Sequence, residues 1–540
     1  MLALYRRLSL VFFLLLTAIV ICIYIVNLKF VLDNQFFIDD SYIYLRFARN
    51  FVQGFGLVWN RGEYPVEGFT SILYLGLLII TEKIGGSSLT FMPILGVVFT
   101  FITFVLSWHL GKILNPGHEL ESLFAVDLIG LSLIFLFWSA TGMEMPLYTA
   151  LLMTSALLYI GYQRRKSPTW LVGIVFAVTA LSRPEGLVIF GITFLFDILS
   201  AVIWRKPILD KNLLYLALSF ILVYMPIFVW KWSYFGYPFP NTYYAKTDGI
   251  SFVQIAGGMK YFISNLPYIL SIVGVPLLFA LLNIRKVREV KDFSVERVYI
   301  AVLIISSLGI VILNGGDHFA RGRFLMPIIP LLVVLSIVVF YSDFLDNFIK
   351  LKNIKPIFLL IPLIVTACYN QPWSIISPHH YETKIPKANP KRFKYFDNWD
   401  VGFVVMGKTL KNIASENESI AVVPIGAIGY YSDMVVIDMV GLVDPVIAHE
   451  PFDPFYVSTW RPGHDKGDGA YILSRHPDYI QFIGLLTSQP LPGLDEYARQ
   501  IKSINEIWES PNFHANYEFY PIKTEGGWYY NLYRKIGKNN

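Results

Sequence analysis

The chain has 540 residues, of which 55% are hydrophobic, 16% aromatic and only 15% charged. Soluble globular proteins contain about 25% charged residues, so this composition excludes a single soluble domain as well as a disordered chain. The formal net charge of +5 is too small to indicate nucleic-acid binding. The two cysteines, Cys22 and Cys368, lie in apolar runs, which excludes a disulfide framework and a cysteine-based zinc site.

Apolar residues are concentrated in the first two thirds of the chain. Up to residue 371, long apolar runs alternate with short polar loops, and about 20 apolar residues are enough to cross a bilayer. Beyond this point Pro, Asp, His, Lys and Gly become frequent, and no run is long enough to span. We therefore expect a polytopic α-helical membrane domain over residues 1–371 and a soluble α/β domain over residues 372–540.

The apolar runs predict about eleven transmembrane helices. The run 170–202 is interrupted at Arg183-Pro184 and is expected to form two short or tilted helices. The run 69–84 is short and flanked by charges, and we interpret it as an amphipathic helix on the outer surface. The other spans are expected over residues 8–28, 91–110, 122–138, 146–162, 212–231, 265–283, 297–313, 324–341 and 355–370.

Lysine and arginine residues set the orientation, because they are enriched in cytoplasmic loops. Arg6 and Arg7 place the N-terminus inside, and the basic loop 164–166 is also inside if the run 69–84 does not cross. The C-terminal domain and most polar segments then lie outside the cytoplasm, where nucleotides are absent. An enzyme with this arrangement would need a donor delivered in the membrane. The outer segments are 33–68, 141–144, the break at Arg183, 232–264 and 314–323.

Two adjacent aspartates, Asp39 and Asp40, follow the first apolar run. If a helix starts here, Asp39, Tyr42, Arg46 and Arg49 share one face, while Asp40 points about 100° away. A partly desolvated carboxylate close to an arginine has the properties of a general base for a sugar hydroxyl. The alternative is a helix cap followed by a solvated turn.

The outer segment 314–323 combines glycines with basic residues. Exposed backbone N–H groups together with Arg321, Arg323 and His318 favour phosphate binding. The two arginines could instead extend to the membrane surface. Asp317 and His318 could hold a divalent cation, although two ligands are a weak metal signal.

Other candidates each allow two interpretations. Glu67 is either a second acid or the start of the surface helix, and Glu144 either positions substrate or caps a helix. Arg183 either pairs with Glu185 or binds a phosphate. The aromatic segment that contains Tyr243 and Lys246 either stacks sugars and holds an anion or anchors the chain at the membrane interface.

The C-terminal domain is expected to contain strands over residues 419–423 and 434–437, with turns at Gly426 and Gly441. Asp438 and Asp444 follow the second strand, where they either bind substrate or cap turns. His464 lies further along the same polar stretch.

The Asp39-Asp40 pair after the first span, the outer surface helix and the basic loop before a late span together resemble the GT-C glycosyltransferases. These are polytopic enzymes that use polyprenyl-phosphate sugars as donors. The chain resembles, in particular, the terminal arabinofuranosyltransferases of mycobacterial cell-wall arabinan assembly and their bacterial relatives. The motifs that carry this resemblance are Asp39-Asp40-Ser41-Tyr42, Gly142-Met143-Glu144, Arg183-Pro184-Glu185, the segment 240–246, Gly315-Gly316-Asp317 and the segment 438–442.

The resemblance implies transfer of a sugar, arabinofuranose in the arabinan-making enzymes, from a polyprenyl (decaprenyl) phosphate to an acceptor glycan or glycolipid. Transfer would take place on the outer face of the inner membrane, with the C-terminal domain seating the acceptor. No cofactor is certain and a divalent cation is possible. The roles implied are Asp39 or Asp40 as base; Arg323, Arg321, His318 and Arg183 for the phosphate; Arg46, Glu67, Glu144, Tyr243, Lys246 and Asp317 for the substrate cavity; and Asp438, Asp444 and His464 for the acceptor.

Two other functions remain open on the sequence. A lipid or solute transporter would carry charges along a path across the midplane, whereas here the charges gather at one face. A non-catalytic membrane scaffold would use its outer domain to bind glycan.

Overall fold

The computed structural model describes residues 2–33, 37–203, 211–247, 249, 251–282, 294–319, 321–341, 355–369, 399–453 and 461–537. The chain divides into two compact units. The first comprises residues 1–33, 93–227 and 256–375, and the second comprises residues 34–92, 228–255 and 376–540. The domain boundary expected between residues 371 and 372 falls outside the described residues.

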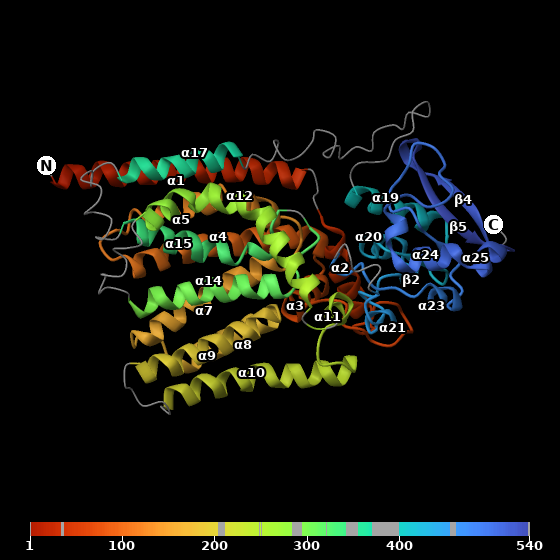
Figure 1. Cartoon of the computed structure of the whole chain (residues 1–540), viewed down its shortest axis with the longest axis horizontal. Coiled ribbons are helices and arrows are strands. Elements are labelled where there is room, and N and C mark those ends of the chain that lie inside the picture. The colour runs from red at the N-terminus through yellow and green to blue at the C-terminus, as the bar shows by residue number, and fades with distance from the viewer. Residues whose placement is uncertain are drawn as a thin grey trace. The chain divides into compact units, whose positions relative to one another are not determined.

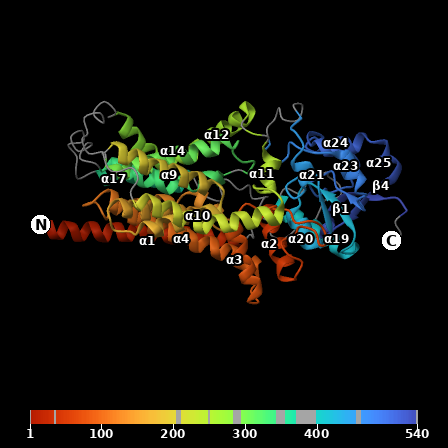
Figure 2. The ribbon, with the colours of Figure 1, turned by 90° about the horizontal axis from the view of Figure 1, so that it is seen from below.

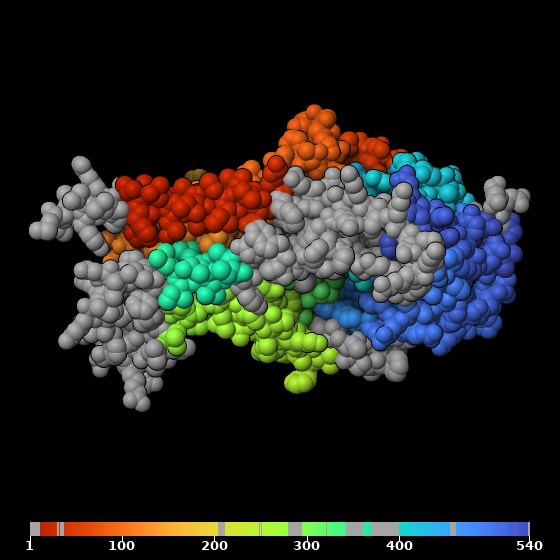
Figure 3. All heavy atoms as spheres, turned by 90° about the horizontal axis from the view of Figure 1, so that it is seen from above, coloured from red at the N-terminus to blue at the C-terminus, as the bar shows by residue number. Residues whose placement is uncertain are grey.

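The first unit is helical. Figure 1 shows α7, α8 and α9 side by side, and Figure 3 shows α1 next to α17 on one face of this unit. Helices α4, α10 and α12 also contribute residues to the second unit. The elements are α1 (Leu2–Asp33), α4 (Ser88–Leu114), α5 (Leu123–Gly130), α6 (Leu133–Trp138), α7 (Met145–Gln163), α8 (Thr169–Ser182), α9 (Glu185–Ile203), α10 (Lys211–Phe235), α12 (Phe252–Leu282), α14 (Val295–Leu313), η1 (Arg323–Leu325), α15 (Ile328–Phe340) and α17 (Lys355–Tyr369).

Seven helices in the described part of the chain are long and apolar enough to cross a membrane, and α8 and α15 are shorter apolar helices. The protein is therefore a multi-pass membrane protein. The count of about eleven spans is not confirmed. The seven helices are α1, α4, α7, α9, α10, α12 and α14.

Breaks in the backbone explain two features of the apolar pattern. The two helices expected within residues 170–202 are present, because Arg183 precedes a proline and adopts an extended conformation that ends α8. The expected span 122–138 is instead divided into α5 and α6, since Ser132 is extended (φ −68°, ψ 125°). The hydrophobicity of the run 122–138 did not indicate this break.

The second unit surrounds a five-stranded sheet of order β2-β1-β3-β5-β4. Strands β1, β2 and β3 are parallel, and β5 runs antiparallel to β3 and β4. The elements are α2 (Asp39–Val52), α3 (Ile72–Lys83), α11 (Asn241–Lys246), α19 (Trp399–Ile413), β1 (Ser419–Val422), α20 (Gly426–Ser432), β2 (Val435–Asp438), α21 (Pro445–Ala448), α23 (Gly469–Ser474), β3 (Tyr479–Ile480), η3 (Ala498–Gln500), α24 (Lys502–Glu509), α25 (Pro511–Asn516), β4 (Tyr517–Lys523), η4 (Glu525–Gly527) and β5 (Tyr529–Lys535).

The two predicted strands are present within one residue of their expected ends. The turn expected at Gly426 is wrong, because this residue begins α20; Gly441 does turn the chain, with φ 87°. Residues 72–83 are helical, as expected for the run 69–84. The place of this helix on the membrane surface stays a prediction.

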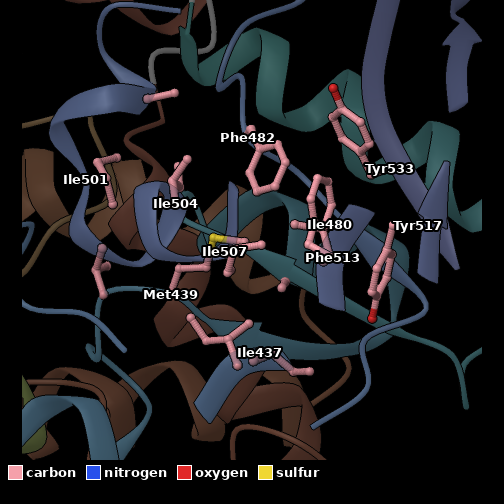
Figure 4. Close-up of a cluster of buried hydrophobic side chains, with 14 of the residues drawn as sticks. Ile437, Met439, Ile480, Phe482, Ile501, Ile504, Ile507, Phe513, Tyr517 and Tyr533 are labelled. Atoms are coloured by element: carbon pink, nitrogen blue, oxygen red, sulfur yellow. The ribbon is translucent and has the colours of Figure 1, made fainter. Parts of the chain in front are cut away.

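Helices cover both faces of the sheet. Figure 2 shows α19 and α20 on one side of β1, and α23 and α24 on the other. Because successive strand residues point to opposite faces, Ala421 and Ile437 join the core beneath α24, while Ile420 and Val436 are buried against the other layer. Figure 4 shows the first of these cores, in which aromatic side chains such as Phe482 and Phe513 pack against isoleucines of α24.

Candidate functional site

The predicted site residues fall into two groups, one in each unit. In the second unit, Asp39 begins α2, and its carboxylate lies at the start of α20. Its two oxygens accept hydrogen bonds from the backbone N–H groups of Gly426 (3.0 Å) and Ala427 (2.7 Å). The N–H of Asp39 in turn donates to Asp400 Oδ1 (2.9 Å). The N–H groups of Gly426 and Ala427 are among those that a helix leaves unpaired at its start, so Asp39 caps α20 from a distant part of the chain.

Burial and the cap have opposite effects on the pKa of Asp39. Burial raises the pKa of Asp39 from 3.8 to about 7, although the two backbone hydrogen bonds favour the charged form. The neighbouring Asp40 raises it further by charge repulsion. In its charged form, this carboxylate interacts favourably with the positive end of the α20 helix dipole.

Arg46 binds α20 near Gly429, one turn after the residues that Asp39 caps. Its guanidinium donates to the carbonyl oxygens of Trp59 (2.9 Å) and Met434 (2.8 Å), to that of Gly429, and to Asn60 Oδ1 (2.9 Å). Only 4% of Arg46 is exposed. Burial lowers its pKa to about 9, which keeps the side chain charged at neutral pH. These four hydrogen bonds are all made within the protein.

The shared face predicted for α2 is confirmed, and it packs against α20. Tyr42 contacts the rings of Tyr430 and Tyr431 at centroid distances of 5.7 and 5.6 Å. Arg49 donates to the carbonyl of Tyr430 and pairs with Asp433 at 2.6 Å. Asp40 is partly exposed, and its position on α2 is about 100° away from this face.

Glu67 is buried and paired with Lys231. Burial raises the pKa of Glu67, and the ammonium group opposes this effect. Lys231 was not predicted from the sequence. A single lysine in the apolar run of α10 was the available signal, because isolated charges in such segments usually have a functional partner.

The predicted residues Tyr243 and Lys246 both lie on α11. Tyr243 is 46% exposed, and the aliphatic part of Lys246 lies beside Gly463. Asn241 holds the start of this helix: its N–H donates to the carbonyl of Glu67 (2.8 Å), and its side chain donates to that of Gly441 (2.8 Å).

The C-terminal candidates have structural contacts of their own. Asp438 accepts hydrogen bonds from the N–H groups of Val440 and Val443, each at 2.8 Å, and burial raises its pKa to about 7. Asp444 caps α21 and pairs with Arg475 at 3.3 Å. His464 is half-buried in the loop that follows Arg461. Both aspartates therefore support the loop after β2, as turn caps.

In the first unit, Arg183 joins two carboxylates. It forms an ion pair with Glu144, and it contacts Glu185 through both Nε (3.0 Å) and Nη2 (2.7 Å). The predicted Arg183–Glu185 pair is thus present. The second oxygen of Glu144 is buried and has no hydrogen-bond partner among the described residues.

The segment 314–323 places its charged residues in a tight loop. Arg323 is bidentate to Asp317, with distances of 2.7 and 3.1 Å, and His318 Nδ1 lies 3.6 Å from the same carboxylate. Arg321 has a left-handed backbone (φ 67°). Its guanidinium lies over the ring of Phe137 at 4.1 Å, and its carbonyl accepts a hydrogen bond from Trp138.

The residues around Arg183 and those of the segment 314–323 meet at Phe324. Its ring lies 5.0 Å from the guanidinium of Arg183 and 4.8 Å from that of Arg323. We call this set the arginine cluster; it consists of Glu144, Arg183, Glu185, Asp317, His318, Arg321 and Arg323. Its three arginines and three carboxylates cancel in formal charge. Phe324 also lines a pocket with about 370 Å³ of empty space, part of it open to solvent, together with Arg183, Glu185, Asn314 and mostly apolar side chains of α7, α14 and α15.

Nothing in the described ranges gathers three or more His, Cys, Asp or Glu side chains in a way that could hold a metal ion. Asp317 and His318 thus gain no third such ligand there, and the Asp317 carboxylate is bound to Arg323.

Comparison with known proteins finds a family model, a curated relative and several solved structures. A model of a domain of unknown function, DUF8728, matches residues 395–533. A terminal β-(1→2)-arabinofuranosyltransferase of Mycobacterium tuberculosis (strain ATCC 25618 / H37Rv) is 28% identical over 344 residues, which are 57% of this chain and 53% of the relative. The chain therefore spans about half the length of the curated relative that it matches.

Among solved structures, the archaeal oligosaccharyltransferase AglB from Archaeoglobus fulgidus, in complex with an inhibitory peptide and a dolichol-phosphate, matches 95% of this chain and 74% of its own, with a TM-score of 0.51 and 12% identity. The chain has the GT-C fold. The resemblance to the terminal arabinofuranosyltransferases is likewise confirmed. ArnT from Cupriavidus metallidurans, bound to undecaprenyl phosphate, matches 79% of this chain and 85% of its own at a TM-score of 0.49 and 11% identity.

The cap at Asp39 predicts an unusual response to Gly426→Ala. A Cβ at position 426 would lie 1.9 Å from the Asp39 carbonyl oxygen, so α2 must move, although alanine favours a helix over glycine by about 1 kcal/mol. We expect a lower temperature of thermal unfolding. Gly484→Ala is the matched control, since its nearest atom would be 3.9 Å away. A rise in stability with Gly426→Ala would contradict the cap.

Asp438 predicts a pH effect on stability. Because its pKa rises from 3.8 to about 7 on folding, the folded protein binds this proton more tightly than the unfolded chain, and the stability that it contributes falls as pH rises through 7. The difference in unfolding temperature between wild type and Asp438→Asn should therefore be larger at pH 5 than at pH 8. A difference that grows with pH would mean that the two N–H groups hold Asp438 in its charged form.

Proposed function

We propose that the chain is a membrane glycosyltransferase that moves a sugar from a polyprenyl-phosphate donor to an acceptor glycan or lipid-linked glycan. The observation that carries this proposal is the 28% identity to an arabinofuranosyltransferase over 344 residues. The GT-C fold supports it. The name of that relative makes arabinofuranose the first sugar to test.

The acidic start of α2 supplies the base in this proposal. Both oxygens of Asp39 are committed to the backbone of α20, which makes Asp39 a positioning residue. Asp40 is the next residue of α2, and its position is about 100° away from the face that packs against α20. We therefore assign Asp40 as the base that takes the proton from the acceptor hydroxyl. Arg46 holds α2 in place and is assigned no contact with substrate.

The arginine cluster receives the leaving group. As the acceptor oxygen bonds to the anomeric carbon, the bond from that carbon to the phosphate oxygen breaks, and the electron pair leaves with the polyprenyl phosphate. Its growing negative charge is best met by fixed cations. His318, which is exposed, and Arg321, which is partly exposed, would contact the phosphate, while Asp317 keeps Arg323 in position.

The carboxylates of the cluster balance its charge and offer an acceptor for a sugar hydroxyl. The three carboxylates balance the arginines, so that the cluster does not bind anions too tightly. The Glu144 oxygen that has no partner among the described residues can accept a hydrogen bond from a sugar hydroxyl. Glu67 and Lys246 remain candidates for the sugar, and Asp438, Asp444 and His464 for the acceptor. The proposed location is the inner membrane, with the N-terminus in the cytoplasm and the sheet outside.

Asp40→Asn tests the base. We expect the rate of arabinofuranose transfer from decaprenyl-phosphate arabinofuranose to fall by about 10²–10⁴-fold, and the unfolding temperature is measured to show that the variant is folded. Purified protein and a cell-envelope glycan acceptor are used, and product is followed by radiolabel. Glu416→Gln, a change of an exposed carboxylate on the same unit, should leave the rate unchanged. Transfer by Asp40→Asn at the wild-type rate would exclude the assignment.

Arg321→Gln tests the phosphate contact. Loss of a charge-assisted hydrogen bond costs about 1.5–3 kcal/mol, so the KM for the donor should rise roughly 10- to 100-fold while the KM for the acceptor stays constant. Arg165→Gln is the matched control, because Arg165 also has a left-handed backbone (φ 57°) but lies in a different loop. An unchanged donor KM in Arg321→Gln would place the phosphate elsewhere.

A further inference from the structure

Aromatic side chains gather on the surface of the second unit, directly after α10. Gly236 turns the chain there with φ 81°. The rings of Tyr237 and Tyr244 both stack against His449, at centroid distances of 4.4 and 4.3 Å and interplanar angles near 30°. Phe239 and Tyr243 extend the group, 5.1 Å from each other. We call these five residues the aromatic platform: Tyr237, Phe239, Tyr243, Tyr244 and His449.

The platform is exposed. Tyr237, Phe239 and Tyr243 are 41%, 46% and 46% exposed, and His449 is exposed as well. Large contiguous aromatic surface is uncommon on a protein without a binding role. The exposure therefore calls for a ligand or a partner.

The tyrosines of α11 and His449 are both held by the segment that follows β2. Asn241, which is 3% exposed, ties α11 to the carbonyl of Gly441 after β2. His449 follows α21, and its Nδ1 contacts the carbonyl of Pro445 at 2.7 Å, which directs Nε2 away from the backbone. The rings are thus fixed before any ligand arrives, and little conformational entropy is lost on binding.

We propose that the aromatic platform binds the acceptor glycan by stacking against its sugar rings. One face of a sugar ring presents C–H bonds, which pack on the negative face of an aromatic ring. Tyrosine hydroxyls and the imidazole Nε2 can form hydrogen bonds with sugar hydroxyls at the edges. This inference rests on the proposed function, because it assigns the acceptor to a surface that the sequence left undecided between sugar and membrane.

Two observations favour a glycan over a lipid surface. Helix α10 already has exposed tryptophans in its last turns, Trp230 (44%) and Trp232 (50%), and tryptophan at the end of a span is the usual interfacial anchor. The platform begins only after that helix ends. It also contains His449 from the sheet-bearing part of the chain, whose polar ring contacts both Tyr237 and Tyr244.

The platform is continuous with a candidate substrate region. The N–H of Asn241 donates to the carbonyl of Glu67, whose buried carboxylate pairs with Lys231, and Lys246 lies on the same short helix as Tyr243 and Tyr244. A glycan on the platform would therefore lie next to charged groups suited to its hydroxyls.

The test measures glycan binding without a donor. Purified full-length protein in lipid nanodiscs is titrated with soluble arabinan and mannan oligosaccharides, and binding is followed by calorimetry and saturation-transfer NMR. We expect wild type to bind at least one of them, and the double variant Tyr237→Ala, His449→Ala to bind roughly tenfold or more weakly. Tyr64→Ala is the matched control, because Tyr64 is 95% exposed on the same unit and lies outside the platform.

The outcomes separate this inference from the proposed function. Unchanged binding by the double variant, or no binding of either glycan by wild type, overturns the platform. Variants that bind glycan normally but no longer reconstitute into vesicles would show a membrane anchor instead. Glycan binding that depends on the platform, in a protein that transfers no sugar from the polyprenyl-phosphate donor, would leave the platform standing and refute the transferase. Unfolding temperatures confirm that the double variant is folded.

Discussion

The packing of α2 against α20 is the interaction on which the candidate site depends. Asp39 caps α20, Arg46 binds three carbonyl oxygens and Asn60, and Arg49 pairs with Asp433. A buried guanidinium is costly unless its donors are satisfied, and a carboxylate at a helix start supplies bonds that water would otherwise provide. Each side therefore satisfies the polar groups of the other, and the direction of Asp40 is set by the sheet-bearing part of the chain.

The sequence predicted the features that depend on local spacing. Apolar runs identified most membrane helices, and the 3–4-residue spacing of Asp39, Tyr42, Arg46 and Arg49 correctly placed them on one face. Its contacts with α20 could not be predicted, because the two helices are separated by more than 380 residues in sequence at these contacts. The division of the run 122–138 was also missed, since hydrophobicity does not report a single extended residue such as Ser132. Lys231 was overlooked, although a lone charge in an apolar helix was visible.

The arginine cluster shows why composition alone is a poor guide to a phosphate site. The segment 314–323 reads as basic, yet Arg323 is neutralised by Asp317, and Arg183 by Glu144 and Glu185. Under the proposed function, the polyprenyl phosphate must leave after each turnover, and a cluster of balanced charge with partly exposed cations would release it more readily than an unpaired set of cations. The pairing of Arg183 with Glu185 was predictable from their closeness in sequence, whereas the approach of Glu144 was not.

The distance in sequence between Asp39 and Gly426, 387 positions, has a consequence for biosynthesis. Helix α2 leaves the ribosome early, whereas its support is translated only after nearly all of the membrane helices. Until then this face of α2 lacks its contacts with α20, and the aspartates have no support from that helix. Under the proposed function, a chain truncated before α20 would carry the residues assigned to the donor but would lack the contacts that orient the base, so we expect it to be inactive.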